Sequence, residues 1–399
     1  MSFGSHIGKA KTGTVLGRPV KCVAIVGGTH GNELTGIALT HTYRKTDVLS
    51  KRYPSLRCLT VTGNPDAVRL CQRFCDKDLN RCFTADILAT KKSHNVEEKS
   101  LLEERRARQL AASFEENEVD LCIDFHNTTS SSNCIIISEW DPFSYHCALF
   151  MLEEAHHLNP NIKLFSPAPL PDGDPWLPDL HAHQSPFANV GSSVRANLGI
   201  EIGPQSHGTL HEWTYKLADT LLRAALTFCE LYNTGQLHPA VDDREIFVLN
   251  HAVRFPDVDE EGPDLERLSS AIHPALQGRD FHPLHFGDPA FVLFGGRATK
   301  TVTRTRQVNT TVSTANPIIS QGTGATIQAA KSKADVEATH AANCGAAIEV
   351  YTWQKGDLCY PVFVGEAAYR SKGIAFYACD RHMLRIPPLQ CVVVGQQGP

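Results

Sequence analysis

One short motif has the residue types and spacing of half a metal site. Residues 27–33 read Gly-Gly-Thr-His-Gly-Asn-Glu and follow an apolar run, Val20–Val26. The run is rich in β-branched residues and ends in glycines, so it predicts a buried strand followed by a sharp turn. His30 and Glu33 can converge on one ion if the next helix begins there. The motif therefore supplies two candidate ligands and requires a third.

The spacing by itself is weak evidence. His94 and Glu97 repeat it in the polar stretch Lys91–Ser100, and His181 and His183 form another pair among prolines. A solvated, charged stretch does not predict a metal site, so we interpret both pairs as incidental.

The third candidate ligand is His126, which ends the apolar run that begins at Leu121. The carboxyl ends of parallel strands meet at one edge of an open α/β sheet, where ligands bind, so we expect His126 near His30. Two histidines and one carboxylate leave a fourth tetrahedral position open, as in catalytic zinc sites. Asp124 is either the orienting partner of a ligand imidazole or a residue that faces a helix.

Hydrolysis at such a site also needs a group that moves protons and groups that hold an anionic substrate. Glu201 lies in an apolar strand, where partial removal from water suits it to accept and release protons; the alternative is an edge strand with Glu201 in solvent. Arg81 can grip a carboxylate with Asn80 beside it, and Arg73 could stabilise an oxyanion. Asp78 is expected to hold one of these arginines.

Alternating strand and helix patterns through about residue 235 predict an α/β fold with a largely parallel sheet flanked by helices. On the helix after the first motif, Leu34, Ile37 and Ala38 are expected to face inward. Expected strands are Val20–Val26, Cys58–Thr62, Leu121–Phe125, Cys134–Ser138 and Leu198–Ile202, and expected helices are Glu97–Phe114 and Leu210–Tyr232, the latter with a core stripe that includes Leu210, Trp213, Leu217, Leu221 and Phe228.

After Asn233 the sequence pattern changes to short apolar segments interrupted by proline and glycine. They include Ala290–Phe294, Tyr360–Val364 and Ile374–Tyr377. At 399 residues the chain is long enough for two cores. We therefore expect a catalytic domain over residues 1–235 and a smaller β-rich domain over residues 236–399. Residues 297–350 are poor in large apolar side chains, which predicts a flexible insertion rather than a binding arm.

Composition narrows the class of partner. The chain has 38 basic and 43 acidic residues, a net charge of −5, which gives no reason to expect nucleic acid or an anionic membrane. Apolar runs are too short for membrane insertion, and the first residues lack a secretory leader. The 13 cysteines without regular spacing then indicate reduced thiols and a cytoplasmic protein.

Four motifs together resemble the aspartoacylase family, which also includes the aminoacylase of N-acyl aromatic amino acids. They are residues 27–33, Asp78-Leu-Asn-Arg81, Asp124-Phe-His-Asn-Thr-Thr and Gly199–Gln205. The resemblance continues through residues 272–277, 283–285, 287–289 and 360–369, and thus spans nearly the whole chain apart from the insertion.

The resemblance implies a zinc-carboxypeptidase-like fold, a C-terminal β-domain that helps cover the active-site channel, one Zn²⁺ per subunit and a homodimer. Glu366 looks like a structural carboxylate. By matching positions, His30, Glu33 and His126 would bind zinc, Glu201 would handle protons, Arg73 would polarise the scissile carbonyl, and Asn80, Arg81 and Tyr369 would bind the substrate α-carboxylate.

The expected activity is hydrolysis of a small N-acyl L-amino acid, such as an N-acetyl one, to a carboxylate and a free amino acid. An additional arginine of aspartoacylase falls on Gly191 and a nearby tyrosine on Phe187, while Ser371–Gly373 matches the aromatic-specific relative. Without a cationic pocket a side-chain carboxylate is costly to bury, which favours neutral or aromatic amino acids. Arg195 or Lys372 could restore such a pocket, so N-acetyl-L-aspartate stays an alternative.

Two further alternatives are open. A related carboxypeptidase or desuccinylase would share the architecture and the metal. A catalytically silent binding protein would use the insertion to recruit a partner, but the presence of both the ligand set and Glu201 argues against it.

Overall fold

The structure is a computed structural model, and it describes residues 18–89, 100–138, 140–170, 176, 189–237, 242–256, 268–294, 328–329, 349–356 and 358–389. The chain forms two compact units. The first contains Met1–Asn127, Asn133–Ile246 and Met383–Pro399, and the second contains Thr128–Ser132 and Phe247–His382. The division therefore falls inside a strand, between Ile246 and Phe247, and a short piece after Asn127 belongs to the second unit.

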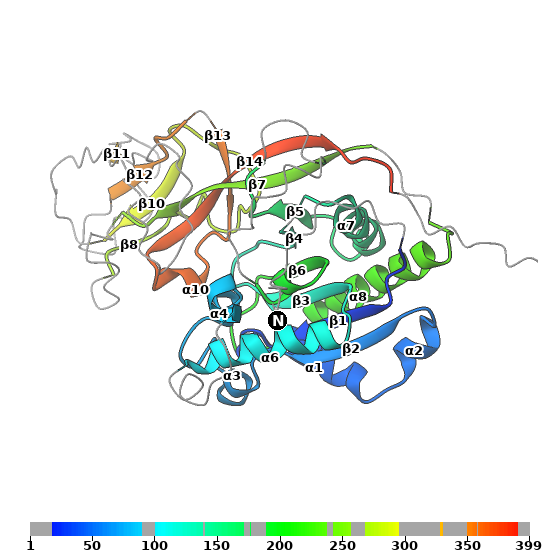
Figure 1. The fold of residues 1–399 in the computed structure, drawn as a ribbon. Coiled ribbons are helices and arrows are strands. Elements are labelled where there is room, and N and C mark those ends of the chain that lie inside the picture. Colours follow the sequence, from blue (N-terminus) through cyan, green and yellow to red (C-terminus); the bar gives the residue numbers. More distant parts are fainter. Residues whose placement is uncertain are drawn as a thin grey trace, which may run out of the picture. The chain divides into compact units, whose positions relative to one another are not determined.

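The sheet of the first unit is mostly parallel (Figure 1). Strand β1 is parallel to β2 and β3, β3 is parallel to β6, and β4 is parallel to β5, whereas β4 is antiparallel to β6. The carboxyl ends of β1, β3 and β6 consequently share one edge, as predicted. In spatial order the strands are β2 (Arg57–Thr62), β1 (Cys22–Gly27), β3 (Leu121–Asn127), β6 (Ala196–Ile202), β4 (Cys134–Ile137) and β5 (Lys163–Ser166).

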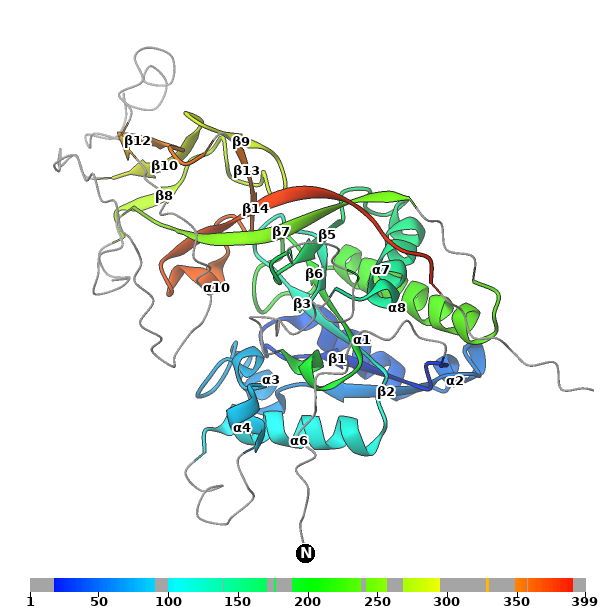
Figure 2. The same cartoon turned by 45° about the horizontal axis from the view of Figure 1, so that its top comes forward.

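Helices cover both faces of this sheet. Side chains of α6, η1 and η3 pack on alternate residues of β1, including Ala24 and Val26, while α1 contacts β1 and β3 and also packs against α8. Helices α7 and α8 lie side by side (Figure 2). The helices of this unit are α1 (Leu34–Arg44), α2 (Val48–Arg52), α3 (Pro65–Leu70), η1 (Leu79–Arg81), α4 (Ala85–Ala89), α6 (Leu102–Glu116), α7 (Pro142–Ala155), η3 (Val190–Ser193) and α8 (Glu212–Asn233).

Helix α1 buries a different face from the one expected, so the prediction of Leu34, Ile37 and Ala38 as its inward residues was wrong. A Cβ atom on Gly36 would lie 2.7 Å from the carbonyl oxygen of Phe125. A Cβ atom on Gly27 would lie only 2.1 Å from the carbonyl oxygen of Gly36. The helix therefore approaches the sheet through small residues. Its buried residues are Thr35, Gly36, Leu39, Thr40 and Tyr43.

Helix α8 follows the predicted bounds closely, and its leucine stripe is mostly core. Leu217, Leu221 and Phe228 are buried, whereas Leu210 and Trp213 are 48% and 41% exposed. The stripe was thus extended too far, because Leu210 precedes the helix, which begins at Glu212, and Trp213 lies in its first turn.

The second unit is β-rich, which confirms the prediction that the C-terminal part of the chain consists mainly of strands. One sheet continues with β7, β14, β13 and β9, and a separate antiparallel sheet has the order β11-β12-β10-β8. Phe291, Trp353 and Phe376 are buried in its core. The elements are β7 (Asp243–Arg254), β8 (Ser270–Ile272), β9 (Leu284–His285), β10 (Pro289–Leu293), β11 (Gln328–Ala329), β12 (Glu349–Thr352), β13 (Leu358–Val362), α10 (Ala367–Arg370) and β14 (Ile374–Arg385).

Several predicted features lie outside the described residues. They are His94, Glu97, His181, His183, Phe187 and, except for β11 and the start of β12, the insertion at residues 297–350. Among the residues that are described, every cysteine is a free thiol, and none of the helices combines the length and apolar character needed to span a membrane.

Candidate metal centre and active site

The candidate ligands come from the ends of two neighbouring parallel strands. His30 and Glu33 follow β1, and His126 lies near the end of β3, whose Phe125 pairs with Gly27 in the sheet. The loop after β1 needs its glycines: Gly28 has φ +74°, and a Cβ atom on Gly31 would lie 2.0 Å from the carbonyl carbon of Ala67. This tight turn ends at Glu33, which is the residue directly before α1.

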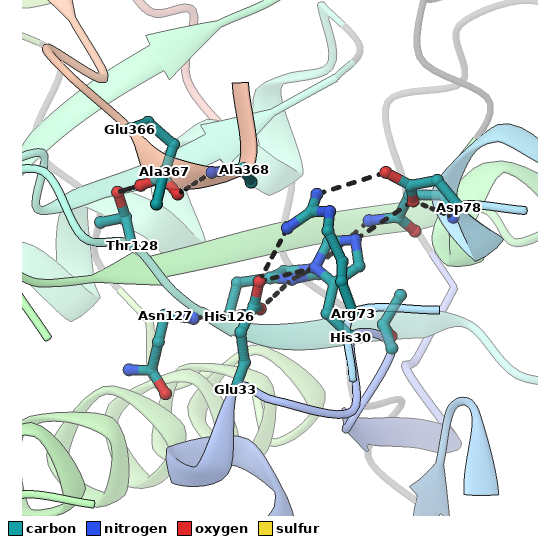
Figure 3. A network of polar contacts seen from close by, with 12 residues as sticks. His30, Glu33, Arg73, Asp78, His126, Asn127, Thr128, Glu366, Ala367 and Ala368 are labelled. Carbon is teal, nitrogen blue, oxygen red and sulfur yellow. Dashed lines mark hydrogen bonds and ion pairs between the residues drawn. The ribbon is translucent and has the colours of Figure 1, made fainter. Parts of the chain in front are cut away.

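Three candidate ligand side chains converge, as Figure 3 shows. The Nδ1 atom of His30 lies 2.8 Å from Glu33 Oε1, the Nδ1 atom of His126 lies 2.9 Å from Glu33 Oε2, and the two Nδ1 atoms are 3.2 Å apart. All three residues are buried. Ligands of a tetrahedral zinc ion with bonds of about 2.0–2.1 Å would be about 3.3 Å apart, so this donor set fits a metal ion with little movement.

Each imidazole has a carboxylate on its other nitrogen. His30 Nε2 lies 3.1 Å from Asp78 Oδ1, and His126 Nε2 lies 2.8 Å from Asp124 Oδ2. An Nε2–H donated to a carboxylate fixes the ring and leaves the Nδ1 lone pair for a metal. Asp124 therefore orients His126, which decides between the two roles considered for it, and it also accepts a hydrogen bond from Thr29 Oγ1 at 2.8 Å.

Charge is concentrated at this point. Burial disfavours ionisation of Glu33, but His30 and His126 outweigh it and hold the pKa of this carboxyl well below its usual range. Asp78 is buried too, and His30 and then Arg73 likewise lower its pKa. Burial opposes a charged His126, yet Asp124 and Glu33 raise its pKa well above the ordinary value. The two carboxylates thus keep their negative charge, which favours a bound cation.

Arg73 lies beside the ligands and links two of the carboxylates. Its Nη1 donates to Glu33 Oε1 at 3.1 Å and its Nη2 to Asp78 Oδ2 at 3.3 Å (Figure 3). The predicted pairing of Asp78 with an arginine is confirmed. The contact of Asp78 with His30 was missed, because no local pattern relates residues so far apart in the sequence.

Asn80 and Arg81 follow on the short helix η1, where the Asp78 side chain accepts a hydrogen bond from the Asn80 backbone at 3.0 Å. The Nδ2 atom of Asn80 lies 3.4 Å from Nε2 of His126. Arg81 donates from Nη1 to the Asn80 carbonyl oxygen at 2.8 Å. Asn80 is therefore brought to the metal ligands, and Arg81 stays next to it.

Glu201 lies on β6, directly across from His126 in the parallel β3–β6 pair. Paired residues of neighbouring strands point to the same face of a sheet, so Glu201 shares the face of His126. Its strand lies between β3 and β4. The alternative of an edge strand is therefore wrong, and Glu201 is half-buried rather than fully solvated.

Asn127 contacts a candidate ligand, and the sequence did not single it out. Its backbone N–H donates to Glu33 Oε2 at 3.2 Å, its Oδ1 accepts from the Thr35 N–H at 3.0 Å, and its Nδ2 donates to the Ile202 carbonyl at 3.1 Å. It is 3% exposed. A buried amide that ties α1, β3 and β6 together keeps Glu33 and the Glu201 strand in register, and the available signal was a polar residue in an apolar strand.

Comparison with known proteins agrees with this geometry. The family model described as the succinylglutamate desuccinylase/aspartoacylase catalytic domain matches residues 19–229. The chain belongs to this family. Rat aspartoacylase is 33% identical over 293 residues, 72% of this chain and 85% of its own length.

Two further proteins match over more of the chain. The human N-acyl-aromatic-L-amino acid amidohydrolase (carboxylate-forming) is 27% identical and covers 93% of this chain and 94% of its own. The crystal structure of murine aminoacylase 3 superposes with a TM-score of 0.67 at 26% identity, over 94% of this chain and 99% of that one.

Two positions, Gly191 and Arg195, were considered above as places for a cation near the side chain of the substrate. A Cβ atom on Gly191 would lie 2.3 Å from the Cβ atom of Asn197, so this backbone leaves no room for a side chain there. Arg195 lies 3.5 Å from Asp120, which precedes β3 and is therefore at the opposite edge of the sheet from His126. The suggestion that Arg195 restores an anion pocket was wrong.

Tyr369 and Glu366 belong to the second unit. The Glu366 carboxylate accepts hydrogen bonds from the Thr129 N–H at 2.7 Å and from the Thr128 hydroxyl, and it also caps α10 through the Ala368 N–H (Figure 3). This supports its interpretation as a structural carboxylate. The Tyr369 ring stacks edge-on against Tyr377.

Proposed function

We propose that this protein is a zinc-dependent amidohydrolase that converts an N-acyl L-amino acid into a carboxylate and a free amino acid. The observation that carries the proposal is the convergence of two Nδ1 atoms and one carboxylate, with Arg73 bonded to that carboxylate and Glu201 opposite His126. The named activities of the aspartoacylase and aminoacylase relatives support it.

His30, Glu33 and His126 would hold one zinc ion per subunit. A zinc ion bound there supplies a Lewis acid that activates water and polarises an acyl oxygen. The imidazole pairs with Asp78 and Asp124 keep both ligand rings oriented.

Glu201 would move the proton. It takes a proton from water as the water oxygen bonds to the acyl carbon, and it passes that proton to the nitrogen as the carbon–nitrogen bond breaks. Arg73 would donate to the oxygen on which negative charge develops, for which it must redirect one N–H from Glu33.

Asn80, Arg81 and Tyr369 would bind the α-carboxylate of the amino acid. Asn80 and Arg81 are adjacent residues of η1, and an amide and a guanidinium would both supply N–H donors to a carboxylate. For Tyr369 the support is the motif at residues 360–369, which resembles the family.

We favour neutral or aromatic amino acids as substrates. The lack of space at Gly191 and the position of Arg195 remove two ways of placing a cation around the substrate side chain. N-acetyl-L-aspartate is a second candidate, because the relative named aspartoacylase has the higher identity, 33% against 27%.

The test combines metal analysis of the purified protein with a substrate panel of N-acetyl-tyrosine, N-acetyl-aspartate, N-succinyl-glutamate and a short peptide. We expect about one zinc per chain and a preference for N-acetyl-tyrosine. Glu201→Gln should keep its zinc and lose about 100- to 10,000-fold in kcat. Protein without zinc contradicts the proposal, and removal of the peptide's C-terminal residue would instead indicate a carboxypeptidase.

We also expect a cytoplasmic homodimer. The free thiols support a reducing compartment, and the dimer is an expectation from the family resemblance. Sedimentation of the purified protein and imaging of a tagged chain test these two points separately.

A further inference from the structure

A buried carboxylate outside the candidate site has no role in the proposed reaction. Glu103, in the first turn of α6, is 0% exposed. Its Oε1 accepts from the Cys75 N–H at 2.6 Å and from Asn64 Nδ2 at 3.0 Å, and its Oε2 accepts from the Asp76 N–H at 3.1 Å and the Lys77 N–H at 3.0 Å. Each oxygen therefore serves two donors.

The three backbone groups lie between two residues of the candidate site. Arg73 precedes Cys75 and Asp78 follows Lys77, and Arg73 and Asp78 contact each other at 3.3 Å. The segment also supplies an acceptor to α6: Asp76 Oδ2 accepts a hydrogen bond from the Leu102 N–H at 2.8 Å. The loop is thus fastened to the helix in both directions.

Glu103 suits this task through its chemistry. Four donors converge on two oxygens, and a carboxylate offers acceptor lone pairs on both atoms. Glutamine would turn an amide NH₂ group toward the N–H groups of Asp76 and Lys77, leaving buried donors unpaired. The neighbouring Glu104 differs, since its side chain is partly exposed and pairs with Lys77 Nζ at 3.0 Å.

We propose that Glu103 is a positioning residue for the active site: by holding residues 75–77 it fixes Arg73 and Asp78 against Glu33 and His30. The inference rests on the proposed function for its catalytic part. The resulting chain of contacts runs from the Glu103 carboxylate through the backbone to the Arg73 guanidinium and ends at Glu33.

The first test needs no activity. Hydrogen exchange read by mass spectrometry should show residues 75–77 protected in the wild type and in the matched control Glu104→Gln, and exchanging at least about 10-fold faster in Glu103→Gln. Peptides from β1 and β3 should be unchanged. Protection of residues 75–77 that persists in folded Glu103→Gln would refute the tether.

The second test asks whether Glu103 acts through Arg73. We expect Glu103→Gln to lower kcat about 10- to 100-fold while KM changes less than about threefold, and Glu104→Gln to resemble the wild type. In an Arg73→Gln background the same change should cost less than about threefold in kcat, because Arg73, the one of the two positioned residues that is assigned to the acyl oxygen, is gone. Equal losses in both backgrounds would overturn the positioning role and indicate general destabilisation.

A third variant covers the case in which Glu103→Gln does not fold. Glu103→Asp keeps the charge but shortens the side chain, so it should give an intermediate exchange rate and an intermediate kcat. A variant with wild-type kcat in which residues 75–77 exchange fast would contradict the proposal. A wild-type protein inactive on the whole substrate panel would refute the proposed function instead, and hydrogen exchange would still decide whether Glu103 holds the loop.

Discussion

Each histidine of the candidate metal centre is held at both ring nitrogens. Nδ1 of each ring lies next to Glu33, and Nε2 lies next to Asp78 for His30 or Asp124 for His126. With a metal ion on Nδ1, each ring would carry its proton on Nε2 and donate it to that aspartate, which fixes the orientation of the ring. The aspartates would therefore influence metal affinity although neither is one of the three candidate ligands.

At this scale we predict that Asp124→Asn weakens zinc binding by about 10- to 100-fold. The amide can still accept a hydrogen bond but no longer carries the charge that orients His126. Competition with a chromophoric chelator measures the affinity. The control is Asp66→Asn, because the ion pair that the structure gives to Asp66 is with Arg69 on α3 and not with a candidate ligand. Equal affinities of Asp124→Asn and the wild type would disprove this role.

At the scale of elements, the approach of α1 to the sheet decides where Glu33 lies. The helix contacts β1 and β3 through Gly36, which has the carbonyl oxygen and Cβ atom of Phe125 within 3 Å of where its own Cβ would be. Alanine favours a helix by up to about 1 kcal/mol over glycine, but here the added methyl group overlaps backbone atoms that cannot move aside.

We therefore predict that Gly36→Ala lowers the free energy of unfolding by about 1–3 kcal/mol despite the gain in helix propensity. Urea unfolding followed by circular dichroism measures it. Ala38→Gly on the same helix is the comparison for propensity alone, because Ala38 is only half-buried. A stabilised Gly36→Ala protein would show that α1 can shift away from the sheet.

Much of the site could be predicted at this scale because it obeys a simple rule. His126 and Glu201 each lie in the last two residues of an apolar parallel strand, and His30 follows another such strand. The rule places them at one edge without knowledge of any distance. No such rule gives the buried face of α1. There a single close contact at Gly36 outweighs the apolar pattern from which the inward residues were predicted.

Other features could not be predicted because they depend on pairs that are distant in sequence. Glu103 is one of several charged residues in Leu-Glu-Glu-Arg-Arg, and nothing local distinguishes it from Glu104. Only the folded chain shows that one of the two carboxylates is fully buried against residues 75–77 while the other is partly exposed. The contact of Asp78 with His30 is of the same kind.

At the scale of the whole molecule, the second unit has an acid-sensitive residue of its own. His251 on β7 lies 3.2 Å from Lys355 Nζ through its Nε2 atom. Burial, and next the charge of Lys355, lower its pKa from 6.5 to about 4, while Asp380 acts in the opposite direction. The folded protein therefore keeps this ring neutral at pH values where the unfolded chain protonates it.

It follows that the titration of His251 leaves stability unchanged well above pH 6.5 and lowers it progressively as the pH falls from 6.5 to about 4. We predict that His251→Gln reduces the loss of stability over this interval. Urea midpoints at several pH values between 4 and 7.5, for both proteins, test this. Parallel pH profiles of variant and wild type would contradict it.

The order in which the chain is synthesised has a consequence for the loop after His126. Thr128 and Thr129 belong to the second unit, and the carboxylate that holds Thr128, Glu366, comes 238 residues later. At about 5–20 residues per second, a ribosome needs about 10–50 s to reach it. During that interval the nascent chain already carries all three candidate metal ligands, but the carboxylate that accepts hydrogen bonds from Thr128 and Thr129 has not yet been made.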